Sequence, residues 1–374
     1  MKNIKAFFEE NDGVGLLKTL CAIPSPSHFE DERASFCLDW FRSCGYENAY
    51  IDSAKNVLCP INCEGSDSIT VFSAHTDTVF PDREPMPFTE TEEKYLCPAV
   101  GDDTASLTLL LLAAKYLREN GFEPKNGVLL VCNSCEEGLG NLLGTRTYMR
   151  DYAGRIKELI AFDSYFSEIA NACVGSERFR VSVKTRGGHS FADFGATSAI
   201  HVLSRMINKI YAISVPHIGK SRTTYNVGLI EGGTSVNTIA QSAEMLCEFR
   251  SDNADCMEIM RRQFFEIFDE AQSPDAEITV ETVGERPCGK NVDEARMNEL
   301  CETCRTIIED VTGQKVSCVS SSTDCNIPLS MGIPAIAIGI YDGDGEHTRE
   351  EWIYKDSLLP GFEIALRVIR AVCG

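Results

Sequence analysis

The sequence predicts an α/β protein whose helix-covered, largely parallel sheet is interrupted by a smaller α+β insert. Strand-like apolar runs alternate with amphipathic helical segments up to about residue 176 and again after Pro287, which is typical of strand–helix–strand units. Between these parts the order becomes β-α-β-β-α-β, the ferredoxin-like arrangement. The expected domains are therefore a discontinuous α/β domain, residues 1–176 and 286–374, and an insert, residues 177–285.

The first part of the α/β domain begins with two helical segments, "NIKAFFEEN" and "VGLLKTLCAI", which end at "PSPS". A further helix is expected from Ser27, because Glu30 three residues later gives the spacing of a capping box. The strongest helix is expected in "VGDDTASLTLLLLAAKYLRENG", with Gly121 as its stop. Strands are expected at 48–52, 56–60, 68–74, 127–133 and in "KELIAFD", with a helix near 141–152 and a long loop reaching to about 100.

The insert is expected to contain, in order, the strand "RFRVSVKTRG", the helix "ATSAIHVLSRMINKIYAI", the strands "RTTYNVGLIEG" and "AEMLCEFRS", the helix "DCMEIMRRQFFEIFDEA" and the strand "AEITVETVG". The α/β pattern then returns with a helix at 293–311, the strands "KVSCVSS" and "IPAIAIGIY", and a closing helix from about 356. We therefore expect the segments on both sides of the insert to build one sheet.

Composition limits the classes of function. A formal net charge of −21 disfavours nucleic acid and anionic membrane surfaces as partners, since both bind basic patches. The apolar run at 107–114 is well short of a membrane span, and "MKNIKAFFEEND" has no apolar stretch typical of a signal peptide. We expect a soluble cytoplasmic protein that acts on small molecules.

The 17 cysteines are expected to be reduced thiols that mostly pack in the core. Two CxxC pairs, Cys132 with Cys135 and Cys301 with Cys304, have the spacing of a structural zinc site. Core packing is the better interpretation, because the first pair spans the end of a strand and the second lies in a helical pattern.

Polar side chains follow the ends of the predicted α/β strands, where sites form in open α/β sheets. Such a concentration of buried negative charge needs cations to balance it. Imidazole and carboxylate ligands without thiolate favour zinc, with cobalt or manganese as substitutes, and a bridging carboxylate would hold two ions. One of two adjacent glutamates can then bind a metal while the other takes a proton from activated water. These polar residues are His75, Asp77, Asp102, Asp103, Glu136, Glu137, Asp163 and His347.

Six motifs in the same order along the whole chain resemble those of a family of two-zinc metallohydrolases that includes aminoacylase, succinyl-diaminopimelate desuccinylase, carboxypeptidase G and peptidase T. The motifs are "SAHTDTVFP", "VGDDTAS", "NSCEEGLG", "IAFDS", "GGHS" and "HTREEWI". The resemblance implies a zinc-peptidase-like mixed sheet with a ferredoxin-like lid that commonly dimerises. It therefore also implies a homodimer formed through residues 177–285.

The resemblance also implies roles for single residues. His75 and Asp163 would bind the first of two Zn²⁺ ions, Glu137 and His347 the second, and Asp102 would bridge them. Asp77 would orient the imidazole of His75. Glu136 would be the general base that later protonates the leaving amine, whereas Asp103 is expected to have only a structural role at the helix N-terminus. A cis peptide bond is expected between Asp102 and Asp103.

Three residues of the insert match the substrate-binding positions of the same family. His189 in "GGHS" would polarise the scissile carbonyl, often from the partner subunit, and Asn237 and Arg250 have the family spacing of thirteen residues. An arginine there suits a substrate carboxylate; the alternative is that Arg250 pairs with an acid of the insert. The chain departs from many relatives at Thr104 and Ala105, where they have lysine and a small residue, which affects the subfamily rather than the catalysis.

The expected function is hydrolysis of a peptide or N-acyl amide bond in a small carboxylate-bearing substrate by metal-activated water. "SSTDCNIPLSMGIP" and "HTREEWI" resemble the tripeptidase-like branch, which favours a di- or tripeptidase or an aminopeptidase. An N-acyl-amino-acid deacylase and a carboxypeptidase remain alternatives. An NAD-binding oxidoreductase, indicated by "GLGNLLG" at 138–144, is disfavoured because Glu136 and Glu137 would face the pyrophosphate. A metal-binding protein without turnover would leave Glu136 without a role.

Overall fold

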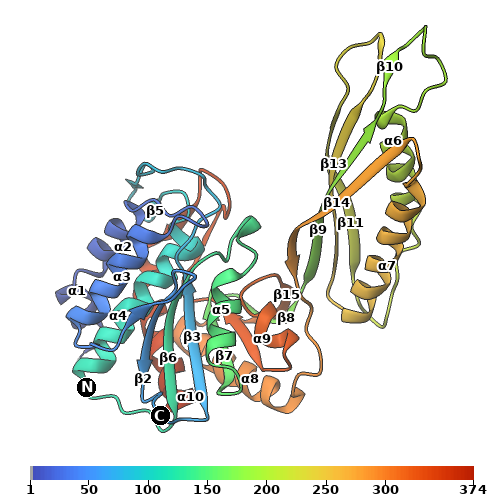
Figure 1. The fold of residues 1–374 in the computed structure, drawn as a ribbon. Helices are drawn as coiled ribbons and strands as arrows, with labels where there is room; N and C mark the ends of the chain where they lie inside the picture. The colour runs from blue at the N-terminus through green and yellow to red at the C-terminus, as the bar shows by residue number, and fades with distance from the viewer. Residues whose placement is uncertain (1–2) are drawn as a thin grey trace. The chain divides into compact units, whose positions relative to one another are not determined.

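The computed structural model describes residues 3–374 and divides into two compact units (Figure 1). The first unit comprises the chain up to Cys173 together with Lys290–Gly374, and the second is Val174–Gly289. Within residues 3–374, every helix is too short or too polar to cross a bilayer.

The first unit is built around an eight-stranded sheet with the order β1-β2-β6-β3-β7-β16-β8-β15. The central strands β6, β3, β7 and β16 run parallel to their neighbours within that group, whereas β1, β2 and β8 introduce antiparallel pairs. This confirms the predicted mixed, helix-covered sheet. The strand bounds are Tyr50–Ile51 (β1), Val57–Ile61 (β2), Ile69–His75 (β3), Gly127–Asn133 (β6), Ile156–Phe162 (β7), Glu168–Cys173 (β8), Ser317–Ser321 (β15) and Ala335–Ile338 (β16).

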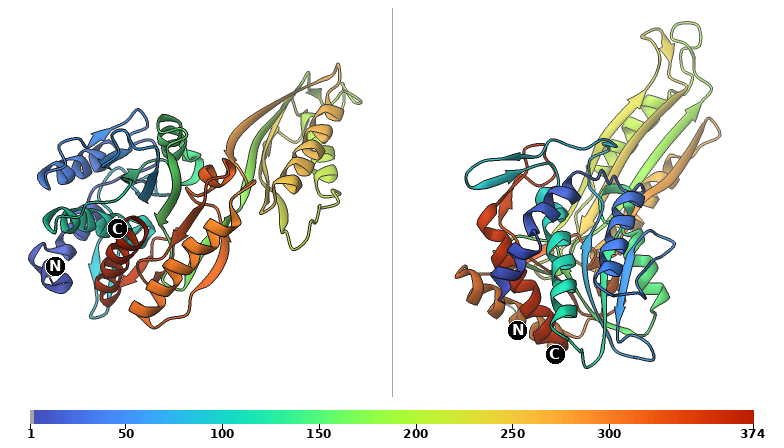
Figure 2. Two further views of the ribbon diagram at one scale, coloured as in Figure 1. Left: turned by 90° about the horizontal axis from the view of Figure 1, so that it is seen from below. Right: turned by 90° about the vertical axis from the view of Figure 1, so that its left-hand side faces the viewer.

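The helices cover a sheet whose central strands are apolar on both faces, so that every residue of β3 and β6 is buried. Helix α10 packs between α4 and α8, and Figure 2 shows these helices side by side. Phe7, Tyr116 and Phe362 form an aromatic cluster that joins α1, α4 and α10, with ring centroids 5.0 to 6.0 Å apart. The helix bounds are Ile4–Glu10 (α1), Gly13–Cys21 (α2), Asp31–Ser43 (α3), Ser106–Glu119 (α4), Leu143–Asp151 (α5), Glu294–Thr312 (α8), Asn326–Ser330 (α9) and Leu358–Cys373 (α10).

Two local expectations are wrong. Helix α3 begins at Asp31, and Glu30 makes no side-chain cap hydrogen bond, so Ser27 and Glu30 do not form a capping box. The long loop expected before residue 100 contains β4 (Thr89–Glu90) and β5 (Lys94–Leu96). These join β17 (Gly343–Asp344) and β18 (Trp352–Tyr354) in a second, four-stranded sheet of order β17-β18-β5-β4. This small sheet brings the loop of His347 to the segment that precedes Asp102.

The second unit has a four-stranded antiparallel sheet of order β11-β13-β9-β14. Along the chain its elements follow the order β9-α6-β11-β13-α7-β14, as the sequence predicts. Its core contains Phe179, Phe249, Phe264 and Phe268. A short ribbon, β10 (Gly188–His189) with β12 (Thr238–Ile239), lies at one end of the unit (Figure 1). The remaining bounds are Gly175–Thr185 (β9), Ala199–Ile210 (α6), Thr223–Gly232 (β11), Ser242–Ser251 (β13), Ala254–Ala271 (α7) and Ala276–Arg286 (β14).

Candidate metal centre

The candidate centre lies at the carboxyl edge of the central parallel strands. His75 is the last residue of β3 and pairs in register with Asn133, the last residue of β6. The segments that follow both strands therefore leave the sheet at the same edge. Asp163 follows directly after β7, and its backbone N–H donates to the carbonyl of Ile338 in β16 at 3.1 Å.

His75 is 1% exposed, and its two ring nitrogens have different partners. Nδ1 lies 3.0 Å from the backbone oxygen of Asp77, and Nε2 lies 2.8 Å from Oδ1 of Asp102. Because a backbone carbonyl can only accept, Nδ1 carries the hydrogen and Nε2 is the nitrogen available to a metal. Asp77 is the residue predicted to orient this imidazole. Its backbone carbonyl lies 3.0 Å from Nδ1, while its carboxylate Oδ1 lies 3.6 Å from the same nitrogen.

Asp102 lies between two imidazoles in the turn Val100–Ala105 that precedes α4. Oδ1 faces Nε2 of His75 at 2.8 Å, and Oδ2 faces Nε2 of His347 at 3.0 Å. Burial alone would raise the pKa of Asp102, but the adjacent imidazoles of His347 and His75 hold it well below its usual value. The expected cis peptide bond between Asp102 and Asp103 is confirmed. Asp103 accepts the backbone N–H of His75 at 2.8 Å, which is a structural contact.

The described residues form three groups whose potential ligand atoms all lie within 4.8 Å of one another. Two of these groups share Asp102: one adds His75 and Asp163, the other Glu137 and His347. The third joins His75 to Glu136 and Glu137. None of these groups in residues 3–374 contains a cysteine, so the thiols of the two CxxC pairs have no part in them.

The electrostatics of the cluster fit a bound cation. Burial, followed by the charge of Asp102, raises the pKa of Glu137 to about 8. Burial and the charge of Asp103 raise the pKa of Asp163 well above its usual value. Two imidazoles cannot balance this many buried carboxylates, whereas divalent cations would. Nitrogen and oxygen donors without sulfur suit zinc, cobalt or manganese.

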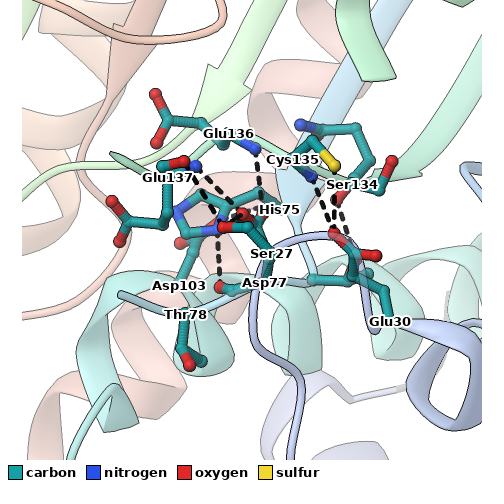
Figure 3. Close-up of polar contacts among 12 residues, drawn as sticks. Ser27, Glu30, His75, Asp77, Thr78, Asp103, Ser134, Cys135, Glu136 and Glu137 are labelled. Carbon is teal, nitrogen blue, oxygen red and sulfur yellow. Dashed lines mark hydrogen bonds and ion pairs between the residues drawn. The ribbon is translucent and has the colours of Figure 1, made fainter. Parts of the chain in front are cut away.

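Asp77 holds the turn that carries the two glutamates (Figure 3). Its Oδ1 accepts the backbone N–H of Glu136 at 2.9 Å and its Oδ2 that of Glu137 at 3.0 Å. Ser27 Oγ donates to the same Oδ2 at 2.6 Å. Burial would raise the pKa of Asp77, but these donors and His75 lower it. One carboxylate therefore fixes the backbone orientation of both glutamates.

Sequence reasoning missed one residue of this centre, Glu351. Its carboxylate accepts the backbone N–H groups of Ala99 at 2.7 Å, Gly101 at 2.7 Å and Asp102 at 2.9 Å. It therefore ties the Asp102 turn to the loop of His347, four residues earlier in the chain. An acidic residue in a loop has no local signal for such a role, although "HTREEWI" repeats the adjacent glutamates of "NSCEEGLG".

The three predicted residues of the insert lie in the second unit. His189 is exposed on β10, and Ser190, which follows it, donates its backbone N–H to the carbonyl of Asn237 at 2.9 Å. His189 and Asn237 are thus neighbours. Arg250 lies near the far end of β13, where its Nε is 2.8 Å from Oε1 of Glu248. The structure therefore brings two of these three residues together, and it pairs Arg250 with an acid of the insert.

Comparison with known proteins gives one family. The model of the peptidase family M20/M25/M40 matches residues 71–371. A succinyl-diaminopimelate desuccinylase of Corynebacterium glutamicum is 26% identical over 353 residues, 91% of each chain. The crystal structure of the aminopeptidase PepT of Bacillus cereus has a TM-score of 0.76 at 22% identity over 99% of both chains. A Bacillus subtilis protein described as a dinuclear metal-binding peptidase of the M20 family has a TM-score of 0.67 at 15% identity, also over 99% of both chains.

Proposed function

The chain belongs to the peptidase family M20/M25/M40, and from this premise we propose that it hydrolyses a peptide or N-acyl amide bond in a small, carboxylate-bearing substrate. The observation that carries the proposal is the pair of ligand groups that share Asp102. Solved relatives that are named an aminopeptidase and a tripeptidase match 97 to 99% of this chain, which supports a peptidase. The named desuccinylase keeps a deacylase as the second candidate.

Two divalent cations, most simply Zn²⁺, are the proposed cofactors, with Co²⁺ or Mn²⁺ as substitutes. His75 and Asp163 would hold one ion, Glu137 and His347 the other, and Asp102 both. When bound, such ions supply Lewis acidity, which polarises a substrate carbonyl and makes a water molecule more acidic. The donor atoms of each group lie within 4.8 Å of one another, which supports this assignment.

Glu136 is the proposed proton carrier. The residue is 5% exposed and lies beside Glu137, and its backbone N–H donates to Oδ1 of Asp77 at 2.9 Å. We propose that its carboxylate takes a proton from the attacking water and delivers that proton to the nitrogen of the leaving amine. Because Glu137 faces His347 at 3.3 Å, the two adjacent carboxylates have separate tasks.

His189 is the proposed carbonyl-polarising residue of the second unit, with Asn237 beside it. Closure of this unit over the substrate would bring the imidazole in and exclude water. Arg250 is the proposed partner of the substrate carboxylate, for which it must leave Glu248.

A homodimer through the second unit is also proposed. Strand β11 is an edge strand that exposes Leu229 and Ile230, by 39% and 54%, and an exposed apolar edge invites pairing with another chain. Light scattering on the wild type and on Ile230→Lys tests it. A monomeric wild type would overturn the proposal.

The decisive experiment compares metal-loaded and chelated protein on dipeptides, tripeptides and N-acyl amino acids. We expect metal-dependent hydrolysis and a fall of more than about a hundredfold in kcat for Glu136→Gln, with metal content retained. Full turnover in Glu136→Gln would contradict the mechanism. A wild type that retains metal but hydrolyses none of these substrates would contradict the function.

A further inference from the structure

We propose that Glu30 is a positioning residue for Glu136. It holds the backbone of Cys135 in the conformation that directs both glutamates in the turn after β6. The proposal rests on the proposed function in so far as Glu136 carries the proton. It also assigns a task to a buried acid outside the ligand cluster (Figure 3).

Glu30 is 0% exposed, and its Oε1 accepts three hydrogen bonds, one from the neighbouring segment and two from a segment far away in the sequence. It accepts the backbone N–H of His28 at 2.8 Å, the backbone N–H of Cys135 at 3.2 Å and the thiol of Cys135 at 3.2 Å. Figure 3 shows the carboxylate directed at Cys135. Glu30 thus connects the start of α3 to the turn after β6, 105 positions later.

The backbone at Cys135 needs such support. Its φ of 56° lies in the left-handed region, where a residue with a Cβ is disfavoured. A residue stays there only when its surroundings hold it. The Sγ of Cys135 is a donor here rather than a nucleophile, because burial and the charge of Glu30 raise the pKa of the thiol.

Three successive backbone N–H groups of this turn donate to buried carboxylates. Those of Glu136 and Glu137 go to Asp77, and that of Cys135 goes to Glu30. Asp77 alone fixes two of the three. Without Glu30 the N–H of Cys135 would be buried and unpaired, and the turn could rotate about the residue just before Glu136.

A simple structural role for Glu30 is a poor account of these contacts. Its side chain does not cap α3, at whose N-cap position it stands. Burial, then the charge of Asp77, raise the pKa of Glu30, so a buried acid is unfavourable there by itself. Its Oε2 is buried and makes no hydrogen bond among the described residues. The hydrogen bonds of the Glu30 carboxylate are therefore those of Oε1.

The test uses Glu30→Ala, Glu30→Gln and Glu30→Asp, with Glu32→Ala as a matched control, an exposed acid in the first turn of the same helix. Hydrogen–deuterium exchange of the 133–138 segment in metal-free protein measures the turn directly. We expect the exchange rate to rise about tenfold or more in Glu30→Ala, because one buried hydrogen bond is lost. The rate should return toward that of the wild type in Glu30→Gln and stay unchanged in Glu32→Ala.

Kinetics on the metal-loaded protein provide the second readout. We expect kcat of Glu30→Ala to fall about tenfold or more with KM within about twofold, and Glu30→Gln to restore most of it, because it keeps the acceptor. Glu30→Asp retains the charge but is one methylene too short, and covers the case in which Glu30→Ala does not fold. Unchanged exchange, or unchanged kcat in a loosened turn, would overturn the proposal. An inactive wild type with the expected exchange pattern would instead count against the proposed function.

Discussion

Glu351 accepts the backbone N–H of Asp102 at 2.9 Å, across 249 positions of the chain. The same carboxylate accepts two further backbone N–H groups, from Ala99 and Gly101. Burial, then the charge of Asp102, raise the pKa of Glu351 to about 8, so the acid is held there against a cost in desolvation. The contact links the two loops that carry the proposed bridging ligand and His347.

Replacement of Glu351 tests this link. Glu351→Ala leaves three buried donors unpaired, so we expect the free energy of unfolding of the metal-free protein to fall by about 3 kcal/mol. The affinity for the ion near His347 should fall as well. Thermal unfolding and metal titration measure both quantities. Glu350→Ala, an exposed neighbour, is the control; an equal effect of the two substitutions would contradict the assignment.

Metal stoichiometry separates the two ligand groups. We expect two ions per chain in the wild type, about one in His347→Ala, and none retained in Asp102→Ala, because Asp102 belongs to both groups. Elemental analysis after gel filtration measures the ratio, with the exposed His201→Ala as the control. Two ions retained in Asp102→Ala would rule out the bridging role.

Removal of metal should also lower stability. Ions that bind only the folded protein stabilise it by about 4 kcal/mol when present at a thousand times their Kd. We therefore expect a chelator to lower Tm, and Zn²⁺ to restore it. In His347→Ala the same chelator should cause a smaller shift, since one ion is already lost.

The elements predicted correctly are those with a strong local signal. Strands β3 and β6 are continuous apolar runs, and α4 has an uninterrupted buried face, so their patterns indicated them without tertiary information. Strands β4, β5, β17 and β18 have two or three residues each, and their sheet depends on the pairing of β18 with the distant β5. No local pattern could indicate them.

The sequence predicted the site residues that lie at or after the ends of strands with a clear apolar pattern. His75 ends β3, and Asp163 and the two glutamates follow β7 and β6. The fold brings their ligand atoms together, and their roles stay predictions. Glu30 and Ser27 were misread because the spacing of a local capping motif was present. In the structure Glu30 accepts a hydrogen bond from Cys135, and Ser27 donates one to Asp77. Glu351 was missed because its three donors lie about 250 positions away.

A buried acid near the centre predicts a pH effect on stability. Nδ2 of Asn133 donates a hydrogen bond to Oδ2 of Asp324 at 2.5 Å, and burial, then the charge of Glu136, raise the pKa of Asp324 to about 7. A raised folded-state pKa means that the acid favours folding below its ordinary value near 3.8 and that this contribution is lost as pH rises towards 7. We expect Asp324→Asn to gain stability relative to the wild type over that range, by about 1.4 kcal/mol for each pKa unit.

Thermal unfolding of metal-free protein at pH 5, 6 and 8 measures this difference. Asp67→Asn, an exposed acid, should keep a constant offset from the wild type. A constant offset for Asp324→Asn as well would show that Asp324 does not titrate in this range.

Thiol accessibility tests the packing of the cysteines. Of the 17 free thiols, only Cys318 is exposed, while Cys44 and Cys288 are partly buried and the others are buried. A thiol-specific reagent should therefore modify one thiol rapidly, two slowly and all 17 after denaturation. Cys318→Ser should remove the rapid phase. Several rapid thiols in the native protein would contradict this packing.

Arg250 provides the test of substrate binding, because its pairing with Glu248 competes with the role proposed for it. Glu248 also contacts Nε of Arg178 at 3.2 Å, so one carboxylate holds two guanidinium groups. If Arg250 binds the substrate carboxylate, Glu248→Gln should weaken the competing pair and lower KM, and Arg250→Ala should raise KM by about tenfold or more. Substrates with an amidated C-terminus should show neither change. If KM for the free acid is the same in Arg250→Ala and the wild type, the pair with Glu248 is the whole role of this arginine.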